Sequence, residues 1–365
     1  MMGLFFFIIL GCLSGFILMK RKTVPIHWEP YKEKGKLSII IPARNEEENI
    51  AHLLDSLHAQ TYHPYEIIVV NDGSSDQTKA VAESYGVKVI DCPKLPQGWT
   101  GKTWAVWNGF LRSTGELIAF LDADIRLAPQ ALEILLKARQ KSGGVLSIVP
   151  YHFTKKLYER LALVFNILGV FAFTSPFEIK NPRKGLYGSC ILTTREDYEK
   201  VKGHDSIKSE ILDDLNLGAR FIEEGIAVHN YIGGDLVAFR MYPQGIKSEF
   251  QGFGKGAVLS TTSLRAPTLL FVVLWILGLV VSESFLFFLE TSFFLPLFIG
   301  YLLYMLQIVY FVKFVGRFGF IMPIFHILST LFFLIVILYS VYQVVFLKEV
   351  TWKGRTVEVG RKRQL

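Results

Sequence analysis

Four short polar segments of the chain carry acidic side chains at positions where they could do chemistry. One is the triplet Asp122-Ala123-Asp124, which follows an apolar run directly. Alternate residues of an extended chain point to the same side, so the two carboxylates face the same way. Two acids at a strand end are costly unless solvent or a cation compensates them, and Mg²⁺ and Mn²⁺ take carboxylate oxygens and bridge phosphates. The triplet therefore predicts a Mg²⁺ or Mn²⁺ site, with a solvated loop as the alternative.

Two further polar segments each follow an apolar run of strand character. Residues 42–47 read Pro-Ala-Arg-Asn-Glu-Glu, and residues 71–76 read Asn-Asp-Gly-Ser-Ser-Asp. Taken singly, acids in a first helical turn can be dipole partners only, and Asn-Asp-Gly is ordinary turn chemistry. Two polar segments at the ends of neighbouring strands together predict a nucleotide cleft.

The fourth segment is Asp213-Asp214, which precedes a helical pattern of apolar residues. Such acids either cap the helix or, in a cleft, act as a general base. Lys102, in Gly101-Lys102-Thr103, is a candidate phosphate contact. The chain has no GxxxxGK[ST] match at Lys102 and no GxGxxG after its first predicted strand, which argues against an ATPase, a GTPase and a dinucleotide enzyme.

The elements that must position these residues form an α/β pattern. Short apolar runs of strand character alternate with helical spacing, and this order predicts a mostly parallel sheet with ligands beyond the carboxyl ends of its strands. The predicted strands are 37–42, 66–70, 87–90 and 116–122, and the predicted helices between them are 46–60 and 78–85.

Both ends of the chain have membrane character. Residues 3–19 carry no charge and are followed by three basic residues, so we expect an uncleaved anchor over 1–22 that enters the cytoplasm, with a signal peptide as the alternative. Beyond Pro267, residues 267–347 contain the candidate spans 268–289, 293–312 and 318–346.

Two segments complicate the count of spans. The apolar stretch 161–175 would put the acidic motifs on opposite sides of the membrane if it crossed, so we expect a helix in the interface or the core. The basic tail 348–365 favours the cytoplasm, whereas four spans starting from outside would leave it outside.

The composition agrees with this division. The 365 residues are 51% hydrophobic and only 19% charged, whereas soluble domains carry about 25% charge. A disordered chain is excluded, and three well-separated cysteines cannot form a disulfide framework. The net charge of +7 needs no nucleic-acid partner, because Lys and Arg accumulate beside membrane segments.

Five segments, in order, carry a family resemblance. They are PARNEEENI, VVNDGSSDQT, GKTWAVWNG, FLDADI and ILDDLNLG, and they resemble family 2 glycosyltransferases of the GT-A fold. The resemblance implies a Rossmann-like, mostly parallel GT-A catalytic domain over 37–250, flanked by N- and C-terminal transmembrane helices.

The resemblance also implies a site for a UDP-sugar. Glu46 and Asp72 would contact the uridine, with Pro42 and Arg44 in the same nucleotide-sugar site, and Lys102 would lie near the phosphates.

The same resemblance assigns the metal and the catalytic acid. Asp124, with Asp122 beside it, would hold the divalent ion that bridges the diphosphate, and Asp122 would also contact the nucleotide-sugar. Asp213 or Asp214 would be the base of an inverting displacement, and Asp214 is preferred.

One motif of the family is missing. Processive members carry QxxRW, but the comparable stretch here begins at Gln251 and contains neither Arg nor Trp. Lys255 or Arg240 would then meet the diphosphate, and 251–266 would be an interface or gating segment, with a plain linker as the alternative. His204 is a candidate for the acceptor pocket, with a structural role as the alternative.

A closer resemblance, to members that glycosylate a carotenoid acid, is carried by 39–47, 146–159, 165–170, 236–245 and 350–355. It implies a multi-pass plasma-membrane hexosyltransferase with a cytoplasmic catalytic domain. The expected reaction moves glucose from UDP-glucose to the carboxylate of a C30 carotenoid acid. The alternatives are another membrane lipid (diacylglycerol, a hopanoid or a ceramide-like lipid), a processive polysaccharide synthase, and a membrane scaffold that only binds nucleotide-sugar.

Overall fold

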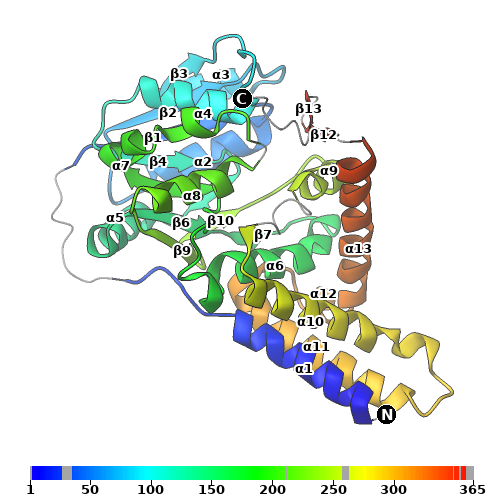
Figure 1. Cartoon of the computed structure of the whole chain (residues 1–365). Helices are drawn as coiled ribbons and strands as arrows, with labels where there is room; N and C mark the ends of the chain where they lie inside the picture. The colour runs from blue at the N-terminus through cyan, green and yellow to red at the C-terminus, as the bar shows by residue number, and fades with distance from the viewer. Residues whose placement is uncertain are drawn as a thin grey trace. The chain divides into compact units, whose positions relative to one another are not determined.

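The computed structural model describes residues 2–26, 35–210, 212–256 and 263–347, together with the backbone of 349–352 and 355–358. The chain divides into two compact units (Figure 1). The sheet unit consists of Lys22–Tyr151 and Pro182–Pro243. The helical unit consists of Met1–Arg21, His152–Asn181 and Gln244–Leu365.

A seven-stranded sheet forms the centre of the sheet unit, in the order β3-β2-β1-β4-β8-β6-β9. Only β8 runs antiparallel to its neighbours, so the predicted mostly parallel α/β sheet is confirmed. The strands are β1 Leu37–Ala43, β2 Glu66–Asn71, β3 Lys88–Asp91, β4 Leu117–Leu121, β6 Val145–Val149, β8 Cys190–Thr194 and β9 Val228–Ile232. A short antiparallel pair, β5 Ile125–Leu127 and β10 Val237–Phe239, lies outside this sheet.

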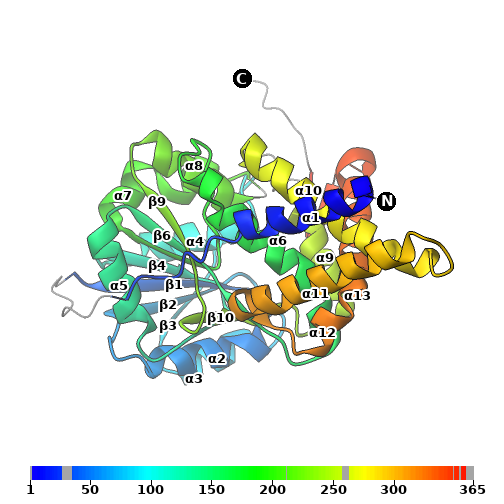
Figure 2. The same ribbon diagram turned by 90° about the horizontal axis from the view of Figure 1, so that it is seen from below.

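The sheet is buried on both faces, which explains the nearly continuous apolar runs of its strands. Ile39 and Ile41 of β1 belong to one core with Leu53 of α2, while Ile40 belongs to a second core with Phe221 of α8. Figure 2 shows α2 and α8 on opposite sides of the sheet. The helices of this unit are α2 Glu47–His58, α3 Thr78–Ser84, α4 Gly101–Leu111, α5 Ala131–Ser142, α7 Arg195–Lys200, η3 Gly203–Ile207 and α8 Asp213–Glu223.

The predicted strands and helices agree with the observed ones to within about two residues, but Pro42 does not end β1 as expected. The strand continues to Ala43, and Pro42 pairs in register with Val70 of β2. The backbone groups of odd-numbered residues in β1 form hydrogen bonds with β2. The backbone of the even-numbered Pro42 therefore points toward β4, whose pairing with β1 ends at Ile40. The missing N–H of proline therefore removes no ladder hydrogen bond.

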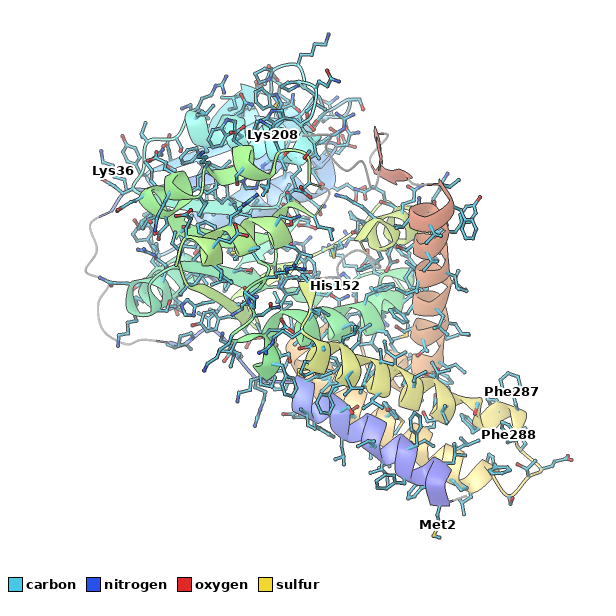
Figure 3. The ribbon with its side chains drawn as sticks, viewed as in Figure 1. Met2, Lys36, His152, Lys208, Phe287 and Phe288 are labelled. Atoms are coloured by element: carbon cyan, nitrogen blue, oxygen red, sulfur yellow. The ribbon has the colours of Figure 1, made fainter. Side chains whose placement is uncertain are left out.

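The helical unit contains four described stretches long and apolar enough to cross a membrane: 158–178, 266–287, 294–315 and 326–347. The N-terminal helix α1 is apolar but shorter, at 17 residues. Figure 3 shows Met2, Phe287 and Phe288 at one end of this unit, and the first two side chains are more than four-fifths exposed.

The bounds of the remaining elements follow the apolar pattern of the sequence. The helices are α1 Met2–Leu18, η1 Tyr158–Ala162, α6 Leu163–Thr174, η2 Pro176–Glu178, α9 Ile246–Gly256, α10 Ala266–Glu283, η5 Ser284–Phe287, α11 Phe294–Val315, α12 Ile321–Ile324, α13 His326–Tyr342 and the π-helical turn η6 Gln343–Leu347. The strands are β7 Tyr151–Phe153, β11 Gly316–Arg317, β12 Glu349–Trp352 and β13 Arg355–Glu358.

Two expectations for the membrane segments can be compared with these helices. The span expected over 318–346 is not one helix, because α12 ends at Ile324, Phe325 leaves the helical conformation with φ −105° and ψ 41°, and the long helix begins only at His326. The stretch expected at 161–175 is helical, and half of its 18-residue apolar window is buried, against a third or less in the other three. Its place in the interface or core remains a prediction.

Candidate active site

A small hollow in the sheet unit brings together residues that lie far apart in the sequence. It opens where β1 and β4 end, as expected for a ligand site of a parallel sheet. Its polar lining comes from Lys102, Asp122, His204 and Asp214. The rest of the lining is Pro42, Val106, Phe120, Leu121, Gly188 and Ile191.

Lys102 joins two of the predicted site acids. Its Nζ lies 3.1 Å from Oδ1 of Asp122 and 3.6 Å from Oδ2 of Asp214. Burial lowers the pKa of Lys102, but Asp122 and Asp214 outweigh burial and hold that pKa well above its ordinary value. About a third of the Lys102 side chain stays exposed, so this charged cluster is accessible from the hollow.

Gly188 allows Asp214 to enter the hollow. A Cβ atom at Gly188 would lie 1.7 Å from Oδ2 of Asp214, so any larger residue would displace the carboxylate. The backbone of Leu186 reinforces this approach by donating to the carbonyl of Asp214 at 3.2 Å. Sequence reasoning missed Gly188, because a single glycine just before the strand β8 does not reveal a contact with Asp214.

The two consecutive acids have different surroundings. Asp214 lines the hollow and contacts Lys102, whereas Asp213 is only 6% exposed. Oδ2 of Asp213 is buried and forms no hydrogen bond with any other residue that the structure describes. The first turn of α8 therefore carries one accessible and one enclosed carboxylate.

The Asp122-Ala123-Asp124 triplet is fixed by its backbone. The N–H of Asp122 donates to the carbonyl of Ser189 at 2.9 Å, and the N–H of Arg240 donates to the carbonyl of Asp124 at 3.1 Å. Arg240, singled out as a diphosphate contact, thus lies beside the triplet. Tyr187 was missed: burial, followed by Asp124 and Asp122, raises the pKa of its hydroxyl, which therefore stays neutral beside these acids.

The triplet fits a divalent-ion site whose remaining ligands would come from the substrate. Across the described ranges, no group of three or more His, Cys, Asp or Glu side chains forms a metal site. Asp122 and Asp124 offer two carboxylates at one strand end, and Mg²⁺ is usually held by one or two carboxylates plus waters and substrate phosphates. The donor set present is sufficient for that type of site.

The two predicted nucleotide segments are hydrogen-bonded to each other. Nη1 of Arg44 donates to the carbonyl of Asp72 at 2.8 Å, and the N–H of Asn45 donates to Oγ of Ser74 at 3.1 Å. Oε2 of Glu46 also accepts from Nδ2 of Asn49 at 2.9 Å, so this carboxylate has a structural contact as well. The predicted adjacency of these two segments is confirmed.

The predicted gating residues belong to the other unit. Gln251 and Lys255 lie on α9 of the helical unit and are not part of the lining of the hollow. Residues 257–262 of the expected segment 251–266 lie outside the described residues.

Comparisons with known proteins agree with this geometry. Residues 38–202 match the family described as Glycosyl transferase family 2. The chain is 34% identical over 338 residues to 4,4'-diaponeurosporenoate glycosyltransferase of Staphylococcus aureus strain MRSA252, covering 90% of this chain and 89% of that protein. The chain belongs to glycosyltransferase family 2.

Further matches support the same conclusion. The protein of the same name from S. aureus strain USA300 is 34% identical over 340 residues, with the same coverage. Among solved structures, the mannosyltransferase PcManGT of Pyrobaculum calidifontis, in complex with GDP-Man and Mn²⁺, matches with a TM-score of 0.58 at 15% identity and covers 95% of this chain and 97% of its own. The GT-A fold and the assignment as a family 2 glycosyltransferase enzyme are thereby confirmed.

Proposed function

We propose that this family 2 enzyme is a membrane-bound inverting hexosyltransferase that moves glucose from UDP-glucose to the carboxylate of a C30 carotenoid acid. The observation that supports a transfer site best is the contact of Lys102 with both Asp122 and Asp214 in one hollow. It brings the residues expected to meet the leaving diphosphate next to the residue expected to meet the acceptor.

On the donor side, Glu46 and Asp72 bind the uridine in the segment pair that also contains Pro42 and Arg44. The hydrogen bonds between these segments hold their side chains in one place before a nucleotide binds. This rigidity lowers the conformational cost of binding.

Asp122 and Asp124 would hold a Mg²⁺ or Mn²⁺ ion. When bound, this ion neutralises the charge that develops on the departing UDP. Lys102 adds a second positive charge, and Arg240, whose backbone is bonded to Asp124, supplies a third.

On the acceptor side, Asp214 at the start of α8 meets the nucleophile in the hollow. Toward a hydroxyl acceptor it acts as a general base. Toward a carboxylate, which has no proton to lose, it orients the nucleophile. Asp213 supports this position from the enclosed side of α8, and His204 lines the acceptor pocket.

The membrane attachment matches an acceptor that is dissolved in lipid. We infer a multi-pass protein of the plasma membrane, anchored by 1–22 and 267–347, with 37–250 in the cytoplasm. The long apolar stretches 266–287, 294–315 and 326–347 and the basic residues 20–22 after the first helix support this arrangement. Gln251 and Lys255 on α9 are then candidates for gating the site.

The test is transfer of radiolabelled glucose in membranes that contain the protein. UDP-glucose and Mn²⁺ are supplied with an extracted carotenoid acid or with diacylglycerol, and matched membranes contain Asp124→Asn. Label in the carotenoid fraction that requires both Mn²⁺ and Asp124 supports the proposal. Label in diacylglycerol alone keeps the transferase and replaces the acceptor. Label in a water-soluble polymer would identify a processive synthase, and no label despite UDP binding would overturn the enzymatic role.

A further inference from the structure

His204 lines the hollow, and its hydrogen bond with Tyr198 determines which ring nitrogen carries the proton. The side chain is 2% exposed, and its Nδ1 lies 2.6 Å from the hydroxyl of the fully buried Tyr198. That hydroxyl already accepts the backbone N–H of His204 at 3.0 Å. Because a phenol has a single proton and the only other partner seen for it in the described chain is Nδ1, the proton is donated there. The ring proton of neutral His204 is therefore on Nε2, the ring nitrogen that does not contact Tyr198 and that is available to a ligand in the hollow.

His204 stays neutral across the working range of pH. The pKa of His204 is lowered to about 4. Burial is the largest cause, Asp213 opposes it by raising the pKa, and Lys102 acts in the same direction as burial. Burial raises the pKa of Tyr198, so its hydroxyl keeps its proton. The pair thus presents an uncharged N–H donor of fixed orientation.

The position of His204 identifies the part of the substrate that it faces. The charged groups that act on its ring are Asp213 of α8 and Lys102 of α4, so His204 lies between the acid pair of α8 and Lys102. In an inverting displacement the nucleophile and the leaving group lie on opposite sides of the anomeric carbon. With the diphosphate held at Asp122 and Asp124, the α8 side is the side of the nucleophile.

We infer that His204 donates its Nε2–H to the carboxylate of an apolar acceptor, and that Tyr198 is a positioning residue that fixes the required tautomer. This inference rests on the proposed function. A carboxylate that approaches Asp213 and Asp214 meets like charges and needs a donor, whereas a hydroxyl needs a proton acceptor, which Asp214 already provides.

The reaction then balances without a proton transfer. One carboxylate oxygen forms the bond to the anomeric carbon while the bond from that carbon to the diphosphate oxygen breaks, and its electron pair leaves with UDP. The other carboxylate oxygen accepts the hydrogen bond from His204. The product is a glycosyl ester.

The test is a matched pair of substitutions at one position. In His204→Gln, the amide nitrogen can replace Nε2 as the donor to the hollow. In His204→Asn, the shorter amide can replace only the Nδ1 contact to Tyr198. With retinoic acid as the probe acceptor, we expect His204→Asn to raise KM for the acid by about 10-fold, as for one lost hydrogen bond to a charged group. His204→Gln should retain most of the wild-type KM, and titration with UDP checks that both variants are folded.

Tyr198 is tested through a double-mutant cycle. Tyr198→Phe should raise KM for the acid by about threefold in the wild-type background, because the ring then populates both tautomers. In the His204→Gln background the same change should have no effect on KM, since glutamine has no tautomer to fix. A loss of fold would instead appear in both backgrounds.

Retinol and a direct binding measurement separate the possible failures. The wild type, loaded with UDP, should bind retinoic acid more tightly than retinol, and His204→Asn should remove that preference. Equal binding of acid and alcohol by the wild type, or equal behaviour of the Gln and Asn variants, would overturn the inference. A loss confined to KM for UDP-glucose would place His204 in the donor site and would also overturn it. Failure of the proposed function is different: it appears as wild-type protein that transfers glucose to no acid.

Discussion

A buried polar group of the helical unit and the acidic cluster of the sheet unit differ in how their hydrogen bonds are completed. In the helical unit, Gln307 of α11 donates to the carbonyl of Cys12 in α1 at 2.6 Å and accepts from Nε1 of Trp275 in α10 at 2.8 Å. One side chain thus joins three apolar helices. In the sheet unit, by contrast, Oδ2 of Asp213 is buried and has no hydrogen-bond partner among the described residues, and Asp122 and Asp214 share Lys102.

A second group in the helical unit follows the first pattern. Oε1 of Glu178 accepts from Oγ1 of Thr268 and from the N–H of Arg265, and Oε2 accepts from Nδ2 of Asn181. Polar groups that satisfy one another in an apolar surround act as connections between helices. Carboxylates that lack some of their hydrogen bonds are costly to bury, so they are retained where a ligand supplies the missing partner. The difference indicates that the helical unit uses polarity for assembly and the sheet unit uses it for chemistry.

The largest effect is expected for the carboxylate that faces the hollow. Asp214→Asn should lower kcat by at least about 10²-fold, the loss expected when the group that orients the nucleophile is removed, while UDP affinity is unchanged. Asp213→Asn is the matched control, one residue away and enclosed, and should lower kcat by less than about 10-fold. Steady-state transfer and UDP titration measure both. If the order of the two variants is reversed, Asp213 is the reacting acid and the contrast between the two carboxylates is wrong.

The close approach at Gly188 gives the next prediction. Gly188→Ala places a methyl group against Oδ2 of Asp214, so we expect transfer to fall by about 10²-fold. Stability should fall by only about 1–3 kcal/mol, as for an overpacked position. Gly35→Ala is the control, because its nearest neighbour is the end of the Leu117 side chain at 3.3 Å. Normal transfer by Gly188→Ala would mean that Asp214 need not occupy its observed position.

In the helical unit, the expected effect is on stability alone. Gln307→Leu leaves the N–H of Trp275 without its partner, which costs about 1–3 kcal/mol, while UDP binding at low temperature should be unchanged. Leu306→Ala is the control on the same helix, since Leu306 is 60% exposed. Thermal unfolding in one detergent compares the variants. A change in UDP affinity with no change in the unfolding midpoint would reverse the roles assigned to the two units.

The sequence predicts the elements of this fold better than it predicts the contacts of the site. Strand 66–70 and helix 78–85 were predictable because apolar periodicity is a local property of the sequence. The same periodicity predicted the sheet and the polar residues at the ends of its strands. The contact of Gly188 with Asp214 and the bond from Tyr198 to His204 were not predictable. Each depends on how distant elements pack against the sheet, and neither residue carries a distinctive local pattern. Gln307 was missed for the same reason: it is a single amide in an apolar run, and its partners lie on two other helices.

Glu249 is one of several buried groups of the helical unit that depart from this contrast, and Nε of Arg160 and Oγ of Ser340 are others. Glu249 allows the sharpest test, with the smallest effect. This residue of α9 lies in the helical unit, yet both of its carboxylate oxygens are buried without a hydrogen bond in the described chain. Burial, with a contribution from Glu159, raises its pKa to about 8. Because the folded pKa is above the unfolded value, stability is greatest below pH 4.5 and falls as pH rises through about 8.

Glu249→Gln removes this titration and should therefore flatten the decline of the unfolding midpoint between pH 6 and pH 9. At pH 8 we expect a net gain of only about 1 kcal/mol, because the glutamine amide is left without a partner in the same place. Glu290→Gln, an exposed change in the same unit, should leave the pH profile of the wild type intact. If Glu249→Gln keeps the wild-type stability profile but lowers transfer, the carboxyl of Glu249 serves the reaction rather than the assembly. Unsatisfied acids would then indicate function in both units, and the contrast would lie between satisfied and unsatisfied groups instead of between the units themselves.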